Sequence, residues 1–111
     1  MMSQKSTTTR VARHVVAQGM INDLQAKEEA ALPLVEECGD VVIGHYRTAL
    51  PNGVYLNASA SREDHLRTLC YHAAVSNTPS VQAAGQVVRE YFEDQIVHQR
   101  IVENLRPMLM Y

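Results

Sequence analysis

The stretch VVREYFEDQIVHQRIVENL, residues 87–105, decides what kind of fold this chain can form. It has the composition of a helix, and Thr78-Pro79 upstream suits an N-cap followed by a first helical position. Pro107 is expected to stop the helix near Arg106. The apolar residues cover more than the roughly 100° that contact with one neighbour requires. We therefore expect a long C-terminal helix that is contacted on several sides.

The apolar residues of this helix fall into three sectors at helical spacing. The first sector continues through Gln95 and His98 and contains Val81, Ala84, Val88, Tyr91 and Val102. Ile101 and Leu105 lie along a second edge with Val97, and the third sector is Phe92 with Ile96. We assign the first sector to the core of the chain itself, which leaves the Phe92–Ile96 sector for contact with another protein.

A second helix is predicted from Arg10 to about Ala31. Its apolar stripe, which we expect to be buried, consists of Val16, Met20, Leu24 and Ala31. Pro33 is expected to break or restart this helix, because proline is tolerated best in a first turn.

Residues 34–50 fit two structures. Val35, Cys38, Val42 and Ala49 follow a helical stripe, which favours a helix from 34 to about 49. The alternative is a short β-hairpin within 41–58, because Pro51-Asn52-Gly53 has turn chemistry and the flanking residues suit strands.

A further helix should begin at Ser61, whose hydroxyl can cap the pattern Ser-Arg-Glu-Asp. Its expected apolar face is Leu66, Leu69, Cys70, Ala73 and Ala74. Ser76-Asn77 should end it. The fold class is therefore mainly α, a small bundle of three to four helices with a long C-terminal helix.

The length of 111 residues is that of one domain. We expect residues 1–8 to form a disordered tail and residues 9–111 a single helical domain. The chain has no Trp and a single Phe, so its core must be mostly Val, Ala and Leu. A net charge of −2 argues against a general nucleic-acid coat, which needs a basic surface.

Cys38 and Cys70, without CxxC spacing, indicate a reducing compartment and two small buried residues. The first residues, MMSQKSTTT, lack the apolar run of a signal peptide, and no stretch approaches the length of a membrane span. We expect a cytoplasmic protein that does not enter a membrane.

No pattern of catalytic, metal or cofactor residues stands out. The five histidines include no pair at i,i+4 spacing that would share a helix face around a metal. Glu63, Asp64 and His65 are adjacent, so on a helix their side chains diverge, and the acids suit a helix first turn. We predict that the protein is not an enzyme and holds no cofactor.

Residues 66–89 form a helix, a short turn and a second helix, which loosely resembles a helix-turn-helix. A DNA-binding regulator is therefore an alternative. Against it, the turn lacks Gly, and residues 80–88 of the would-be recognition helix carry no Lys or Arg for phosphate contacts.

The favoured function is regulation by protein binding, with a homodimer as the expected state. The expected partner-binding residues are Tyr91, Phe92, Gln95, Ile96, Gln99, Arg100, Met108, Leu109, Met110 and Tyr111. In size, helical plan and the apolar helix 87–105, the chain resembles small bacterial antiactivators that bind LuxR-type quorum-sensing regulators. The resemblance implies inhibition of a transcriptional regulator by occupation of its interaction surface. Secretion chaperones and phage-encoded inhibitors share these features.

Overall fold

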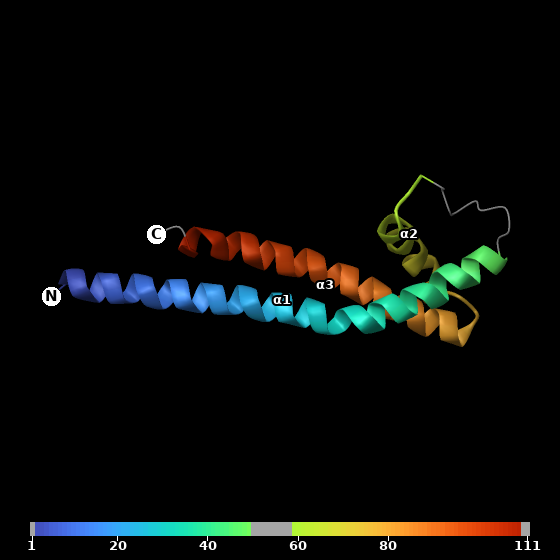
Figure 1. Ribbon diagram of the computed structural model, residues 1–111, viewed down its shortest axis with the longest axis horizontal. Helices are drawn as coiled ribbons and strands as arrows, with labels where there is room; N and C mark the ends of the chain where they lie inside the picture. The colour runs from blue at the N-terminus through green and yellow to red at the C-terminus, as the bar shows by residue number, and fades with distance from the viewer. Residues whose placement is uncertain (1, 50–58, 110–111) are drawn as a thin grey trace. The chain divides into compact units, whose positions relative to one another are not determined.

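The computed structural model describes the backbone of residues 2–49 and 59–109, and the side chains of residues 12–47 and 59–109. The helices are α1 (Met2–Ala49), α2 (Arg62–Ala74) and α3 (Pro79–Leu109), as Figure 1 shows. These described residues contain no β-strand. The predicted mainly helical fold is confirmed.

Helix α1 is longer than the sequence patterns predicted. It begins at Met2, well before Arg10, where the helix was expected to start. It also continues through Pro33, where a break or restart was expected. Pro33 has no backbone N–H, so the carbonyl of Glu29, four residues earlier, does not receive its usual helical hydrogen bond. The hydrogen bonds of the turns on both sides still hold the helix together.

The favoured helix over residues 34–49 is present as the last part of α1. The alternative hairpin within 41–58 would need a strand in residues that are helical here. Its turn and second strand, residues 50–58, lie outside the described residues.

Helices α2 and α3 begin as their capping residues predicted. The Ser61 hydroxyl accepts a hydrogen bond from the backbone N–H of Asp64 at 3.2 Å, and α2 follows at once. Pro79 occupies the first position of α3. At its other end α3 continues to Leu109 and includes Pro107, since a proline so close to a helix end costs only the bond to the Glu103 carbonyl.

The packing of the backbone groups the chain into two compact units. Unit 1 contains residues 1–30 and 95–111, and unit 2 contains residues 31–94. The long helices α1 and α3 each contribute one segment to both units.

Unit 2 holds the larger apolar core, to which all three helices contribute. Its buried residues are Val35, Val42 and Ile43 from α1, Leu66, Leu69, Cys70 and Ala73 from α2, and Val81, Ala84, Val88 and Phe92 from α3. The predicted apolar face of α2 is fully buried. The core sectors predicted from Val35–Val42 and from Val81–Val88 are also confirmed.

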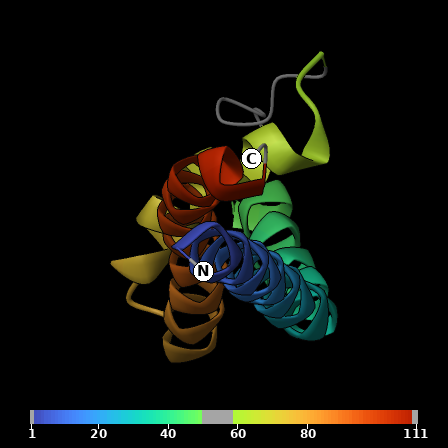
Figure 2. The same ribbon diagram turned by 90° about the vertical axis from the view of Figure 1, so that its left-hand side faces the viewer.

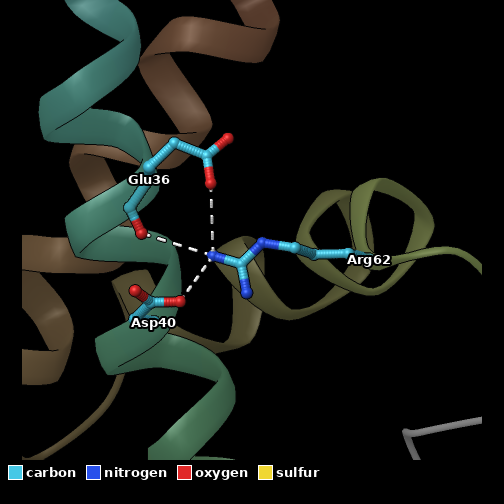
Figure 3. A network of polar contacts seen from close by, with 3 residues as sticks. All are labelled: Glu36, Asp40 and Arg62. Atoms are coloured by element: carbon cyan, nitrogen blue, oxygen red, sulfur yellow. Dashed lines mark hydrogen bonds and ion pairs between the residues drawn. The ribbon is translucent and has the colours of Figure 1, made fainter.

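Two contacts set how α2 packs in unit 2. A Cβ added at Gly85 of α3 would lie 2.5 Å from the Ala73 Cβ and 2.8 Å from the Ala74 backbone nitrogen, so the missing side chain permits this close approach. At the start of α2, the Arg62 guanidinium lies 2.7 Å from Asp40 Oδ1 and 3.7 Å from Glu36 Oε2 on α1 (Figure 3). Both ion pairs are exposed and contribute little to stability.

Candidate protein-binding surface

Unit 1 is held together by a narrow seam between the first part of α1 and the last part of α3. Figures 1 and 2 show the two segments side by side, running in opposite directions. Ala17, Ile21 and Leu105 are the fully buried side chains among the described residues of this unit. Ile101, Val102 and Leu109 pack against them. The hydrophobic core of unit 1 is therefore small.

The spacing of the seam residues is that of a coiled coil. Buried and half-buried positions follow steps of four, three and four along each helix, which keeps them on one stripe. They are Ala17, Ile21, Leu24 and Glu28 on α1, and His98, Val102, Leu105 and Leu109 on α3. At one end of the seam, Glu28 Oε1 lies 3.0 Å from His98 Nδ1, and both side chains are largely shielded from solvent.

The residues immediately before the seam positions form a second stripe on each helix. These residues are Val16, Met20, Asp23 and Lys27 on α1, and Val97, Ile101, Asn104 and Met108 on α3. One residue corresponds to about 100° of rotation about the helix axis. Because the helices are antiparallel, the two rotations have opposite senses and turn both stripes toward the same side of unit 1. We call this side the apolar face.

The residues immediately after the seam positions lie on the opposite side and are polar. They are Gln18, Asn22, Gln25 and Glu29 on α1, and Gln99, Glu103 and Arg106 on α3, all of them exposed. The Gln18 amide donates to Asn22 Oδ1 at 2.9 Å, and the Gln99 amide donates to Glu103 Oε1 at 3.3 Å. We call this side the polar face. Unit 1 is therefore two-sided in its stripes next to the seam. Val15 and Ile96, which lie two residues before seam positions and belong to neither stripe, are also exposed.

Exposure on the apolar face is high for side chains of this kind. Val16 is 61% exposed, Met20 45% and Val97 51%, and Met108 is similarly exposed. Val16 and Met20 belong to the stripe that we expected to be buried, so that prediction is wrong for these two residues, whereas Leu24 and Ala31 of the same stripe are half-buried. The seam instead uses Ala17 and Ile21, one residue further along α1.

The predicted partner-binding residue Phe92 is not available at the surface. It is 6% exposed and belongs to the core of unit 2. The Arg67 guanidinium carbon lies 4.5 Å from the centre of its ring, and the Tyr91 ring meets it edge to face. Ile96 is 48% exposed. Of the Phe92–Ile96 sector that was expected to contact another protein, one residue is therefore buried and the other is exposed.

The other predicted partner-binding residues do not gather on one surface. Ile96 and Arg100 are exposed, whereas Gln99 belongs to the polar face and Gln95 is half-buried. Met108 lies on the apolar face, and Leu109 packs into the seam of unit 1. Met110 and Tyr111 lie outside the described residues. Val16, Met20, Val97 and Ile101 of the apolar face were not among the predicted partner-binding residues. Their helical spacing resembles that of core residues, and this was the only sequence feature that could have indicated them.

The helix-turn-helix-like segment 66–89 uses its second helix for packing. Val81, Ala84 and Val88 are buried in unit 2, and Gly85 is pressed against α2. The exposed side chains in residues 80–88 are uncharged. This surface offers no cation for a DNA phosphate, which is the contact that supplies most non-specific affinity.

The polar cluster Glu63–Asp64–His65 serves the start of α2. The backbone N–H of Asp64 donates to the Ser61 hydroxyl, and Glu63 Oε1 lies 2.8 Å from the guanidinium of Arg67 one turn later.

The two cysteines lie in packed surroundings, and burial raises the pKa of the Cys38 and Cys70 thiols above its usual range. A raised pKa lowers the thiolate fraction and makes a thiol a poorer nucleophile.

No model of a known protein family matches the chain, and neither the curated proteins nor the solved structures include a match to it. Within the described residues, no helix is both long enough and apolar enough to cross a membrane. The apolar face of unit 1 is therefore judged on its own geometry.

Proposed function

We propose that the protein acts by binding another protein chain through the apolar face of unit 1, without catalysis. One observation carries the proposal: Val16, Met20, Val97 and Met108 are exposed together on one side of a two-helix unit whose opposite side is polar. Single exposed apolar residues are ordinary on protein surfaces, whereas several on one side of a small unit mark an interaction site. Here the polar residues Asp23, Lys27 and Asn104 lie among them.

The chemistry of the face specifies the kind of partner. Its apolar residues include two pairs one helical turn apart, Val16 with Met20 and Val97 with Ile101, a spacing at which helices pack against helices. A partner that presents an apolar helix with the same spacing would bury Val16, Met20, Val97 and Ile101 at once. Met20 and Met108 have flexible, polarisable side chains, which adapt to the shape of such a partner.

Regulation of transcription is the narrower form of this proposal. It rests on the resemblance of the chain, in size and helical plan, to antiactivators of LuxR-type regulators. In that form the apolar face would occupy a helical surface that the regulator needs for its own activity. The protein would then work in the cytoplasm as an inhibitor.

Site-specific photocrosslinking in cells of the native host tests the proposal. A photoreactive amino acid at Val97 is expected to give a defined adduct with another polypeptide, because this side chain points toward the partner. The same group at Gln99, on the same helix but on the polar face, is the matched control and should give little adduct. Equal crosslinking from both positions, or none from Val97, would contradict the proposal. Mass spectrometry of the adduct then shows whether the partner is a transcriptional regulator.

A further inference from the structure

We infer that the apolar face of unit 1 is covered by the apolar face of a second copy of this chain. The product is a four-helix bundle, built from the first part of α1 and the last part of α3 of both copies. This inference rests on the proposed function, because it names the occupant of the same face. A face covered by a second copy is closed to a regulator, so the inference replaces the narrower, regulator-binding form of the proposal.

The repeat on the face is the first argument for a second copy. Each face stripe lies one residue before a seam stripe and so shares its spacing, and its apolar members are Val16 and Met20 on α1 and Val97, Ile101 and Met108 on α3. Helices with matching repeats interlock their side chains as knobs into holes. A second copy presents the same stripes on two helices at once. The distance between these two helices matches, because it is the distance between α1 and α3 in unit 1.

The charges on the face are the second argument. Asp23 and Lys27 carry opposite charges, and Asn104 is a neutral amide, so the face has no net charge to repel its own copy. Because Glu28 contacts His98 and the helices are antiparallel, Asp23 and Asn104 lie at nearly the same height along unit 1.

A two-fold axis parallel to the helices would place α1 of each copy beside α3 of the other. Asp23 of one copy then faces Asn104 of the second copy, whose amide N–H can donate to the carboxylate. The two symmetric pairs form one polar layer near the middle of the bundle. Val16, Met20 and Met108 lie on one side of that layer, and Val97, Ile101 and Lys27 lie on the other. A polar layer of this kind fixes register and the number of helices in a bundle.

The size of the face is the third argument. Residues 12–30 of α1 extend over about 28 Å, and two packed helices are roughly 20 Å wide. A projected footprint of these dimensions is about 560 Å², which corresponds to an interface at the small end of those that specific protein complexes form. Ala17, Ile21 and Leu105 are the buried residues among the described side chains of unit 1, and this contact would add to the apolar core that they form.

Sedimentation equilibrium of the full chain, with changes in the polar layer, tests the inference. The wild type should have twice the chain mass of 12.4 kDa. Asn104→Asp places four carboxylates in the layer and should weaken dimerisation by at least about tenfold at neutral pH. Combining Asp23→Asn with Asn104→Asp restores the original number of charges and should restore the dimer. Circular dichroism of each variant checks that the helices remain formed.

Two results would overturn the inference. One is a wild type that sediments as a monomer at the protein concentration used in the experiment. The other is an exchanged double variant that dimerises no better than Asn104→Asp alone, because the two positions would then not face each other. If the wild type is monomeric while Val97 still crosslinks to a different polypeptide, the inference fails and the proposed function stands. If neither a dimer nor any Val97 adduct is found, both fail.

Discussion

Glu28 and His98, which are 70 residues apart in the chain, lie with Oε1 and Nδ1 at 3.0 Å from each other at one end of the unit 1 seam. This contact ties α1 to α3 where the apolar seam residues end. The seam is small, so each of its contacts contributes noticeably to holding the two helices together.

Removal of this contact should loosen unit 1. Glu28→Ala or His98→Ala is expected to lower the free energy of unfolding by about 1 kcal/mol, the usual worth of a hydrogen bond that is partly shielded from solvent. The double variant should lose less than the sum of the two single losses, because both remove the same interaction. Urea denaturation of the four proteins measures this coupling. Fully additive losses would show that the two side chains do not interact.

Phe92→Ala should destabilise the fold strongly. The change leaves a cavity in the unit 2 core and removes the ring beneath Arg67, for a loss of about 3–5 kcal/mol. Ile96→Ala, one turn later on the same helix, should change stability by less than about 0.5 kcal/mol because Ile96 is exposed. Thermal or chemical denaturation compares them. Similar stability of the two variants would contradict the placement of Phe92 in the core.

Two glycines should respond to alanine in opposite directions. Gly85→Ala forces α2 and α3 apart, since the new Cβ meets Ala73 and the Ala74 backbone, and a loss of about 1–3 kcal/mol is expected. Gly19→Ala meets nothing within 4 Å and should stabilise α1 by about 0.5–1 kcal/mol. Denaturation curves of both variants provide the test. A stabilising Gly85→Ala would show that the two helices are not closely packed there.

The two thiols should react slowly with a disulfide reagent at mildly alkaline pH. Burial raises the pKa of each thiol, so little thiolate is present in the folded protein. Cys38 is half-buried and should react before the buried Cys70. Because folding favours the neutral thiol, its contribution to stability is present below the usual thiol pKa and is lost as pH rises above it. Stopped-flow labelling of native and denatured protein measures the rates. Equal rates in the two states would contradict this burial.

Local patterns predicted much of unit 2. Ser61 marked the start of α2, and the spacing from Leu66 to Ala74 marked its buried face. Pro33 misled the prediction of α1, because one missing N–H does not end a helix whose neighbouring turns remain bonded. The burial of Phe92 depends on how α2 and α3 pack in three dimensions, which helical periodicity on α3 alone does not contain.

The surface of unit 1 was harder to predict for a related reason. Two adjacent stripes on α1, Val16–Met20 and Ala17–Ile21, both have the spacing of a core. Periodicity does not distinguish them, and the larger residues were taken for the buried stripe. In the structure Ala17 is buried in the seam, and the larger Val16 and Met20 are exposed. The core-like spacing of Val16 and Met20 is therefore real, and we attribute it to contact with another chain.

Sedimentation velocity of Met20→Lys beside Gln18→Lys tests the central claim most directly. The two residues lie on the same stretch of α1, Met20 on the apolar face and Gln18 on the polar face. Both variants should keep the helical circular dichroism of the wild type, because neither side chain is buried. We expect Gln18→Lys to sediment as a dimer and Met20→Lys as a monomer. Two dimers, or two monomers beside a dimeric wild type, would show that the apolar face of unit 1 is not the surface that binds.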